Sequence, residues 1–384
     1  MTRKVLIVGA GIAGPALAYW LARHGFRPTV VERHPGPREG GQAVDFRGVP
    51  QLTVLDRMGV LPAIRAVQTR PEPIAIVDER GRRLSALPAE LFGGEVEILR
   101  GDLARILHEA TRDVAEYIHD DTITGLDGRE VTFERTPPRS FDLVVGADGT
   151  HSAVRALAFG PSRPRHLGMY GAIFSVPGHH ASQMYSMPGR SATVIGGRAM
   201  LDFASPELDH DHRDVNAQKA LVANVFADAG WRVPALLEAM WQAPDFYFDA
   251  AAQVKLDRWA KGRVALVGDA GYAPGPGGMG TGLAIVGAYV LAGELAAAGG
   301  DHETAFARYE QRLRPYAETC QKQAQGGEQF LVPRKRHQIW LRNQAMRMLP
   351  YVPGIKGMGT KAANAIALED YASAAPPRQD CHRC

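Results

Sequence analysis

Glycines with a characteristic spacing follow the first apolar run of the chain. Gly9, Gly11, Ala13 and Gly14 belong to the run Gly9-Ala10-Gly11-Ile12-Ala13-Gly14, which comes directly after the apolar residues 5–8. The pattern G-x-G-x-x-G between a strand and a helix is typical of a pyrophosphate-binding loop, because a Cβ atom would block the turn, the approach of backbone to phosphate and the helix-to-strand packing. The positive end of the following helix, expected from about residue 12 to 24, attracts the phosphates.

A carboxylate at the end of the next strand supports this interpretation. Glu32 closes the apolar run that begins at Thr29. An acidic residue about 20 positions after the glycines is placed to accept hydrogen bonds from the ribose hydroxyls of an adenosine. A βαβ unit of this kind predicts a bound ADP moiety, but it does not separate NAD from FAD.

Two later segments favour the longer cofactor, FAD. Asp148 follows the buried run 141–147, and Asp269 follows the buried run 263–267. Asp269 is suited to accept hydrogen bonds from ribityl hydroxyls. The loop after it contains Pro276, Gly280, Thr281 and Gly282 and opens an apolar helix, whose N-terminus would stabilise the negative charge of a reduced flavin. Each segment could also be an ordinary turn.

The three segments, in this order, resemble the group A FAD-dependent aromatic hydroxylases, which have the para-hydroxybenzoate hydroxylase-like fold and include the tetracycline-modifying monooxygenases. The resemblance implies a monooxygenase that uses FAD, NAD(P)H and O2 and hydroxylates an aromatic or polycyclic, polyketide-like small molecule through a flavin C4a-hydroperoxide. It adds Arg33 to the cofactor site, matches Arg100 with an arginine near the FAD phosphates, and assigns Asp148 to FAD binding and NAD(P)H approach. Asp45 and Arg47 match a stretch beside the isoalloxazine, which makes them the catalytic candidates, in contact with flavin or substrate.

The chain departs from this family at Tyr272, and Arg38 has two possible interpretations. Tyr272 stands where the family commonly has a histidine, three residues after Asp269, which affects the hydrogen bonding expected near that turn. Arg38 is a candidate NAD(P)H phosphate contact, with a solvated loop arginine as the alternative.

The expected fold class is α/β. A discontinuous Rossmann-type FAD-binding domain of the GR2 type would comprise residues 1–65, 96–165 and 253–300. A largely antiparallel substrate-binding domain would comprise residues 66–95 and 166–252, followed by C-terminal helices over 301–372 and a tail over 373–384. Met184, Tyr185, Arg198 and Met200 are candidate substrate contacts on the inserted sheet, with core or surface positions as the alternative.

Composition excludes several other classes. The 384 residues carry a formal net charge of +3, too balanced for a nucleic-acid partner, and no signal peptide or membrane span is evident. Three cysteines do not make a disulfide framework, so we expect a cytoplasmic protein. We also expect a monomer or a homodimer. We expect no metal site, because Asp209-His210-Asp211-His212 and Cys381-His382-Arg383-Cys384 lack a complete ligand set.

Three alternative functions belong to the same scaffold. A Baeyer–Villiger monooxygenase has no separate motif here, and a flavin-dependent halogenase typically carries a Trp-x-Trp-x-x-Pro sequence that this chain lacks. A non-catalytic protein that binds FAD and a ligand is the alternative from a different class. Hydrolysis has no support, because there is no G-x-S-x-G elbow.

Overall fold

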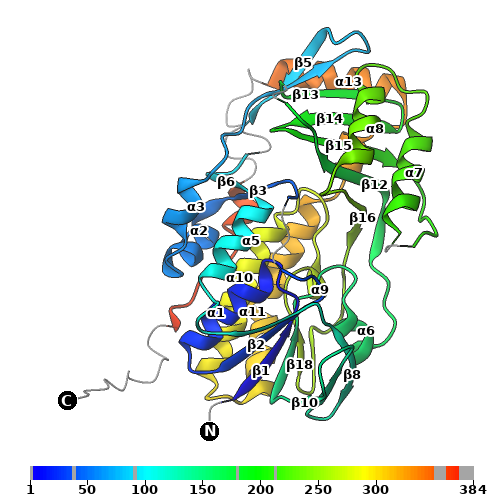
Figure 1. Cartoon of the computed structure of the whole chain (residues 1–384). Helices are drawn as coiled ribbons and strands as arrows, with labels where there is room; N and C mark the ends of the chain where they lie inside the picture. Colours follow the sequence, from blue (N-terminus) through cyan, green and yellow to red (C-terminus); the bar gives the residue numbers. More distant parts are fainter. Residues whose placement is uncertain are drawn as a thin grey trace.

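The computed structural model describes residues 3–36, 40–89, 93–178, 181–211, 214–349 and 360–371. Two sheets organise this part of the chain, a six-stranded sheet in the lower lobe of Figure 1 and a seven-stranded sheet in the upper lobe. Arg38 and the predicted tail over 373–384, with Cys381 and Cys384, lie outside the described residues.

The six-stranded sheet brings the three sequence segments together. Its order is β17 (Ala260–Lys261), β18 (Val264–Leu266), β11 (Leu143–Gly146), β1 (Lys4–Val8), β2 (Arg27–Glu32) and β7 (Glu116–His119). All neighbours are parallel except β17 and β18. Val8 is in register with Gly146, and Gly146 with Leu266. Because parallel strands end at one edge of a sheet, the loops after β1, β11 and β18 meet there.

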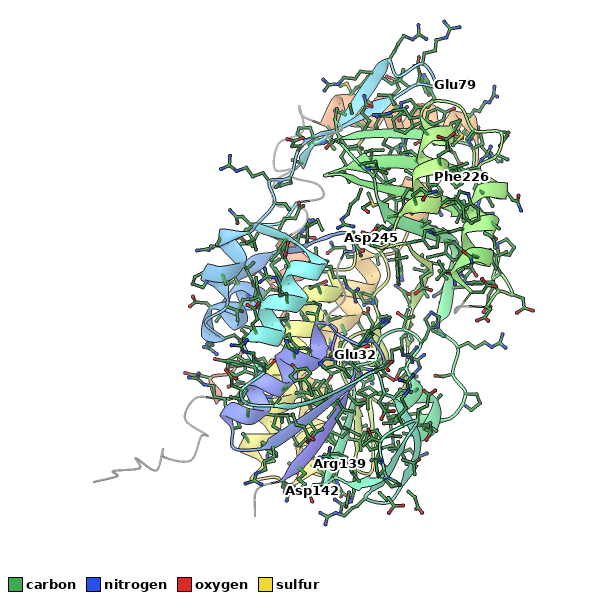
Figure 2. All side chains as sticks on the ribbon, in the orientation of Figure 1. Glu32, Glu79, Arg139, Asp142, Phe226 and Asp245 are labelled. Carbon is green, nitrogen blue, oxygen red and sulfur yellow. The ribbon has the colours of Figure 1, made fainter. Side chains whose placement is uncertain are left out.

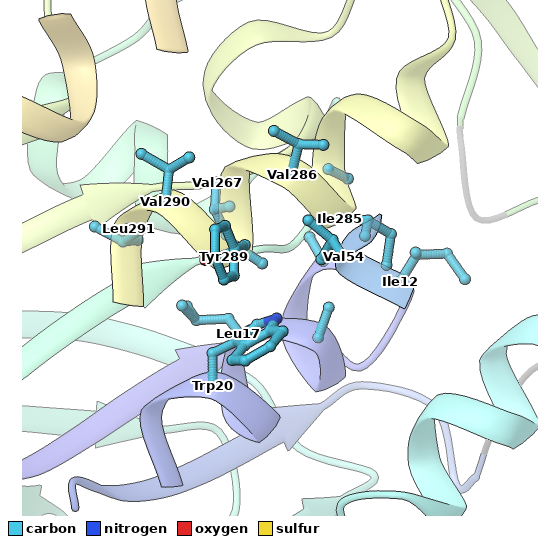
Figure 3. Packing of buried hydrophobic residues seen from close by; sticks show 14 of the residues in the cluster. Ile12, Leu17, Trp20, Val54, Val267, Ile285, Val286, Tyr289, Val290 and Leu291 are labelled. Atoms are coloured by element: carbon cyan, nitrogen blue, oxygen red, sulfur yellow. The ribbon is translucent and has the colours of Figure 1, made fainter. Parts of the chain in front are cut away.

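Helices pack on one face of this sheet and enclose the largest hydrophobic core. The helices of this lobe are α1 (Ala13–Arg23), α2 (Gly48–Arg57), α3 (Leu61–Ala66), α5 (Arg100–Glu109), α6 (Ala153–Phe159), α9 (Asp269–Tyr272), α10 (Gly280–Ala297) and α11 (His302–Gln323). Figure 3 shows Leu17 and Trp20 of α1 facing Tyr289 of α10. Helix α10 is apolar and long enough to cross a membrane by composition, but it is largely buried between α1 and α11, as expected of a core helix.

Two smaller sheets complete the lower lobe. A three-stranded sheet of β8 (Ile123–Asp127), β9 (Glu130–Phe133) and β10 (Arg139–Ser140) packs against the opposite face of the six-stranded sheet. Strands β3 (Ala43–Phe46) and β6 (Val96–Leu99) form an antiparallel pair that leads into α2 and α5.

The seven-stranded sheet forms the inserted layer that the sequence predicted. Its order is β16 (Tyr247–Gln253), β12 (Arg165–Ser175), β15 (Arg198–Ala204), β14 (Arg190–Ile195), β13 (Gln183–Met187), β4 (Ile74–Val77) and β5 (Arg83–Leu87). Only β13 and β4 pair in parallel. Two helices that the alternating pattern did not predict, α7 (Val215–Val225) and α8 (Val233–Gln242), cover one face (Figure 1).

Alternation along these strands gives the sheet two unlike faces. The helix-covered face carries a stack of aromatic rings, with Tyr170 parallel to Phe203 and Phe248 at centroid distances of 5.8 and 5.4 Å. The opposite face, which we call the open face, carries the intervening residues, among them Gly171, Met200 and Asp202. Since side chains alternate along a strand, this division follows directly from the sequence once the strands are placed.

C-terminal helices close one end of the open face. Helices α12 (Gly327–Leu331) and α13 (Arg336–Met348) follow α11, and α14 (Thr360–Ala363) packs on α2. Val332 packs against Met169, and Phe330 and Met346 pack around Met184. Tyr371, the last of the described residues, is held to α10, where its hydroxyl donates to the buried Glu294 carboxylate at 2.7 Å.

Candidate active site

A cavity of about 280 Å³ lies where the loops after β1, β11 and β18 meet. Its walls come from all three sequence segments, from Glu32 at the end of β2, from the start of α5 and from β16 of the seven-stranded sheet. Of the predicted site residues, it is lined by Gly9, Gly11, Ala13, Glu32, Arg33, Arg100, Asp148, Asp269, Gly280 and Thr281.

The three glycines of the first loop have different roles. Gly9 has φ +106°, and a Cβ there would lie 2.5 Å from the Ala147 carbonyl oxygen. A Cβ at Gly14 would overlap the Gly9 carbonyl, so this glycine serves helix-to-loop packing. A Cβ at Gly11 would meet only Arg100 Nη2, at 3.9 Å, and would otherwise project into the cavity. Gly11 is therefore the position at which backbone can approach a ligand.

Glu32 shapes the end of the cavity nearest β2. Its Oε2 accepts a hydrogen bond from the Ala10 N–H at 2.7 Å, and its Oε1 accepts one from the His34 N–H at 3.0 Å. These bonds fix the carboxylate while each oxygen retains a lone pair. Figure 2 shows Glu32 in the middle of the molecule, at the inner end of its strand. The carboxylate is therefore placed to accept hydrogen bonds from two ribose hydroxyls.

Arg100, the first residue of α5, places a cation beside the glycine loop. Its side-chain stem packs against Gly41, and its guanidinium lies near Gly11. Among the residues that the structure describes, no carboxylate pairs with this guanidinium. An unpaired arginine next to backbone N–H groups and a helix N-terminus can bind a pyrophosphate.

Asp269 follows β18 and presents an unsatisfied carboxyl to the cavity. In the described part of the chain its oxygens receive no hydrogen bond. Its enclosed setting raises the pKa of this carboxyl, an effect that Arg100 opposes and Asp249 reinforces. A hydroxyl-rich ligand such as the ribityl chain of FAD would supply the missing donors.

The loop after Asp269 contributes only part of its predicted set. Gly280 and Thr281, at the N-terminus of α10, line the cavity, whereas Pro276 and Gly282 do not. A Cβ at Gly282 would overlap the buried Gln51 amide, so Gly282 allows close packing. Met279, which precedes α10, has the left-handed conformation with φ 56°, a backbone state that non-glycine residues rarely adopt outside sites that require it.

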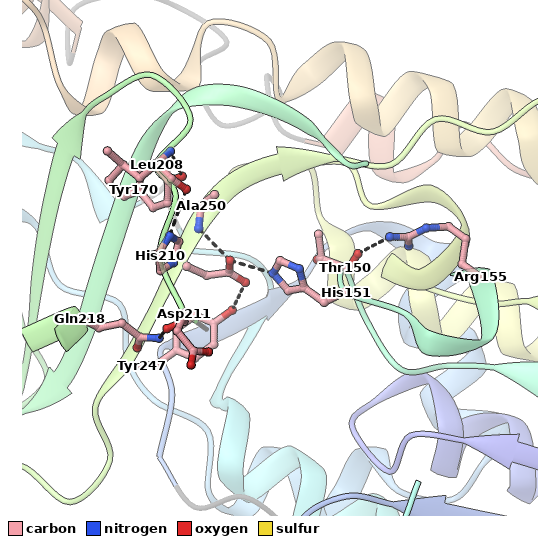
Figure 4. Close-up of polar contacts among 11 residues, drawn as sticks. Thr150, His151, Arg155, Tyr170, Leu208, His210, Asp211, Gln218, Tyr247 and Ala250 are labelled. Carbon is pink, nitrogen blue, oxygen red and sulfur yellow. Dashed lines mark hydrogen bonds and ion pairs between the residues drawn. The ribbon is translucent and has the colours of Figure 1, made fainter. Parts of the chain in front are cut away.

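Asp148 holds its loop in place through bonds to α6. Its carboxylate accepts from the Ser152 hydroxyl at 2.5 Å and from the N–H groups of Ala153 and Val154 at 2.7 and 3.1 Å. Arg155 then donates to the Thr150 carbonyl at 2.6 Å (Figure 4). It also donates to the Ala270 carbonyl at 2.9 Å. The second and third segments are thereby tied together, and Gly149 and Thr150 line the cavity.

A hydrogen-bonded group that the sequence did not single out joins the cavity to the seven-stranded sheet. His151 Nε2 lies 3.1 Å from Asp249 Oδ1, and the Tyr247 hydroxyl donates to Asp249 Oδ2 at 2.9 Å (Figure 4). Burial acts to raise the pKa of Asp249, but hydrogen bonds from His151, Tyr247 and its own strand outweigh it and lower that pKa. Alternation along β16 could have found Tyr247 and Asp249, because Phe248 between them faces the aromatic stack.

The four predicted substrate contacts divide between the two faces of the sheet. Met200 lies partly exposed on the open face, beside Ile173 and Thr193. Met184 shares that face but is 3% exposed beneath the C-terminal helices. Tyr185 points to the opposite face, with its ring 5.9 Å from that of Trp231.

Arg198, the fourth candidate, is occupied by an internal partner. Its Nη1 lies 2.7 Å from Asp245 Oδ2, and Ser175 donates to the same carboxylate through its N–H and its hydroxyl. Figure 2 shows Asp245 where the two lobes meet, and a Cβ at Gly40 would lie 2.8 Å from its Oδ2. The pair therefore lies where the loop before β3, which contains Gly40, approaches the seven-stranded sheet.

The remaining candidates have structural partners. Asp45 and Arg47 form an ion pair with each other beside Gly94 and do not line the cavity. Tyr272 is buried at 1% exposure, and its hydroxyl accepts from the Tyr309 hydroxyl at 3.0 Å, inside the core and away from the cavity. No group of metal ligands is present among the described residues.

Comparison with known proteins agrees with this geometry. A family model described as "FAD binding domain" matches residues 2–324. A flavin-dependent monooxygenase from Legionella longbeachae is 40% identical, over 83% of this chain and 87% of its own length. The uncharacterized protein MT1298 of Mycobacterium tuberculosis is 44% identical, over 83% of this chain and 92% of its own. The crystal structure of the tetracycline destructase Tet(51) has a TM-score of 0.82 and 35% identity, and covers 97% of this chain and 99% of its own.

These relatives identify the ligand that the cavity is built to hold. A glycine loop at a helix N-terminus, an unpaired arginine beside it, and the carboxyls of Glu32 and Asp269 at its two ends suit the successive parts of FAD. The chain belongs to the group A flavin monooxygenases and is an FAD-dependent monooxygenase of the aromatic-hydroxylase type.

Proposed function

We propose that this chain uses NAD(P)H and O2 to hydroxylate an aromatic or polycyclic small molecule that binds on the open face of the seven-stranded sheet. The observation that carries the proposal is the shared wall between cavity and sheet: Tyr247 and Asp249 line the FAD cavity and also belong to the open face. A flat ring system lying on that face would reach the cofactor at this wall.

Bound FAD would accept a hydride from NAD(P)H and activate O2 for transfer of one oxygen atom. The protein binds the cofactor, orients the substrate and shields the reaction from water. Glu32, Arg100 and Asp269 would fix the cofactor, and the N-terminus of α10 would stabilise negative charge near the flavin. Tyr247, Asp249 and the half-exposed His151 form a hydrogen-bonded group in the cavity wall. This group offers a path by which a proton can leave the cavity.

The substrate class follows from the surface that would receive it. Met200, Ile173 and Gly171 give the open face a low, partly apolar surface beside Tyr247, which suits a fused ring system more than a flexible chain. Likeness to the tetracycline destructase over nearly the whole chain supports a polycyclic substrate. Tetracycline is therefore the first compound to assay, followed by phenolic polyketides.

Stopped-flow reduction tests this proposal. The protein reconstituted with FAD is mixed without oxygen with NADPH or NADH, in the presence and absence of tetracycline and of the phenolic panel. We expect bleaching of the oxidised flavin that at least one ring compound accelerates, and a mass gain of one oxygen atom in that compound after air is admitted. A flavin that neither nicotinamide bleaches under any of these conditions would rule out the proposed reaction.

A further inference from the structure

The register of the open face aligns polar and apolar residues into two rows that cross five strands. One row ends at Asp249 and consists of Ser186, Ser191, Asp202, Gly171 and Asp249. The neighbouring row ends at Tyr247 and consists of Met184, Thr193, Met200, Ile173 and Tyr247. Because Tyr247 and Asp249 line the FAD cavity, both rows run outward from the cofactor.

Asp202 stands in the middle of the first row with a carboxyl that lacks a partner. Its Oδ1 lies 2.7 Å from where a Cβ of Gly171 would be, so the carboxyl extends over this glycine toward Asp249. Throughout the described residues nothing donates a hydrogen bond to it or forms an ion pair with it, although the residue is partly exposed. Burial raises the pKa of this carboxyl to about 7.

Two hydroxyl groups beside Asp202 are also unsatisfied. The side chains of Ser191 and Thr193 are 0% and 1% exposed, and neither oxygen has a hydrogen-bond partner. Ser191 is the direct cross-strand neighbour of Asp202, yet the carboxyl is directed over Gly171 instead. Buried polar groups in native proteins nearly always find partners, so this part of the open face has polar groups that a bound water, ion or ligand would satisfy.

The cations around the open face are already committed. Arg198 pairs with Asp245 at 2.7 Å, and His151 lies 3.1 Å from Asp249. Arg342, on α13, donates to the Ser186 hydroxyl at 2.9 Å and to the Phe330 carbonyl at 2.8 Å, and burial lowers its pKa to about 10. A neutral ligand would leave the ionised Asp202 without a counter-charge, whereas a cationic ligand would supply one.

We propose that Asp202 binds a protonated amine of the substrate and thereby holds the ring system on the open face, with its other end at Tyr247 and Asp249. The inference rests on the proposed function, because it specifies the substrate of the same site: a polycyclic or aromatic compound that carries a basic amine. Gly171 is the position that makes room for the contact, because any side chain there would displace the carboxyl.

Proton release should accompany this binding. A cation beside Asp202 favours the ionised carboxylate, so the fraction of Asp202 that is protonated before binding loses its proton. At pH 7 this amounts to about half a proton per molecule bound, since the pKa of the free carboxyl is about 7. The charged or titratable groups on neighbouring elements are Asp249 and Tyr247 on β16, His151 in the loop before α6, and Arg342 on α13.

Calorimetric titration with three matched probes tests the proposal on the FAD-loaded protein. The probes share one ring system and differ in charge: 1-naphthylmethylamine, 1-naphthylmethanol and 1-naphthylacetate. We expect the ammonium compound to bind about tenfold more tightly than the alcohol, with the carboxylate weakest, because a charge-assisted contact is stronger than a neutral one. In Asp202→Asn the amine and the alcohol should bind within about twofold of each other.

Glu207→Gln is the matched control, because it removes the same charge from an exposed position in the same lobe. It should keep the full preference for the amine. Equal binding of amine and alcohol to the unmodified protein, or an unchanged preference in Asp202→Asn, would overturn the proposal.

Titration of the unmodified protein at pH 7 in two buffers of different ionisation enthalpy gives a second measurement that needs no variant. Release of about half a proton with the amine and none with the alcohol supports the assignment, and no release with the amine contradicts it. These measurements involve no turnover. A preserved amine preference in a protein that NAD(P)H cannot reduce would therefore count against the proposed reaction alone.

Discussion

The FAD cavity and the open face of the seven-stranded sheet meet at Tyr247 and Asp249, but they are built in different ways. In the cavity, backbone geometry sets the shape: Gly9 and Gly14 lie where a Cβ would collide with backbone. On the open face, side chains set the chemistry, because a regular antiparallel backbone presents whatever residues alternate along it. At a site shaped by backbone, larger residues are excluded from the glycine positions. At a site made of side chains, a single substitution can change which ligand binds.

The largest contrast is expected between two glycines of the same loop. Gly14→Ala should lower both the stability of the apoprotein and FAD affinity, the latter by more than about 100-fold, because the new Cβ would overlap the Gly9 carbonyl. Gly11→Ala should leave the apoprotein stable and weaken FAD alone, because its Cβ would enter only the cavity. Thermal unfolding of the apoprotein and fluorescence titration with FAD measure the two effects. Normal FAD affinity in Gly11→Ala would mean that the pyrophosphate does not pass this loop.

The two aspartates at the strand ends should behave oppositely. Asp269→Ala is expected to weaken FAD about tenfold, roughly 1.4 kcal/mol, without lowering the stability of the apoprotein, because the carboxyl makes no internal bond in the described chain. Asp148→Ala should destabilise the apoprotein by about 1–2 kcal/mol, because it removes the bonds that cap α6. Titration with FAD and denaturant unfolding of both apoproteins give the comparison. A loss of apoprotein stability in Asp269→Ala would contradict the assigned role.

Asp202 should make stability depend on pH in a direction unusual for a carboxyl. Burial raises its pKa in the folded protein to about 7, above the ordinary aspartate value of 3.8, so the folded state binds the extra proton between these values. Stability therefore falls as pH rises through this window and levels off above it. Asp202→Asn removes the effect, and its stability relative to the unmodified protein should increase from pH 4 to pH 7. Denaturant unfolding of both proteins across this range is the measurement, and parallel curves would show that Asp202 is normally solvated.

The smallest effect is expected in the core, at Tyr272. Tyr272→Phe should cost about 1 kcal/mol of stability, because it removes the buried hydrogen bond between the two tyrosine hydroxyls, while the Tyr309 hydroxyl can then donate fully to the Leu266 carbonyl 2.9 Å away. FAD affinity and the rate of flavin reduction should not change, since the side chain does not line the cavity. A change in either one, beyond the loss of stability, would place Tyr272 in the cofactor's environment.

The two regions also differ in how far the sequence predicted them. The glycine loop, Glu32 and Asp269 were identified because the residues of a backbone-built site stand at fixed spacings after apolar strands. Met279 was not, because a left-handed methionine has no sequence signature. The fold class followed from the same strand-and-helix periods, but α7 and α8 were missed because the whole stretch was assigned to an antiparallel layer.

The open face was predicted less well, because its meaning depends on register. Met184, Tyr185, Arg198 and Met200 were chosen as residues on the inserted strands, but neither their faces nor their neighbours could be read without the pairing. Asp202 sits within an apolar strand pattern, and only its row with Gly171 and Asp249 distinguishes it from an ordinary strand residue. Tyr272 was expected to affect hydrogen bonding near the flavin-binding turn. Its hydroxyl lies instead in the core, in space that a side chain at Gly287 would fill.

Oxygen transfer from O2 is the central claim of this account, and isotope labelling tests it most directly. The FAD-loaded protein is supplied with NADPH or NADH, with tetracycline or a phenolic polyketide, and with ¹⁸O₂ in ordinary water. The mass of the product is then measured by mass spectrometry. Oxygen transfer from O2 predicts a product that carries one ¹⁸O atom and forms only when nicotinamide and FAD are both present. Consumption of NAD(P)H with no labelled product from any of the ring compounds would contradict it.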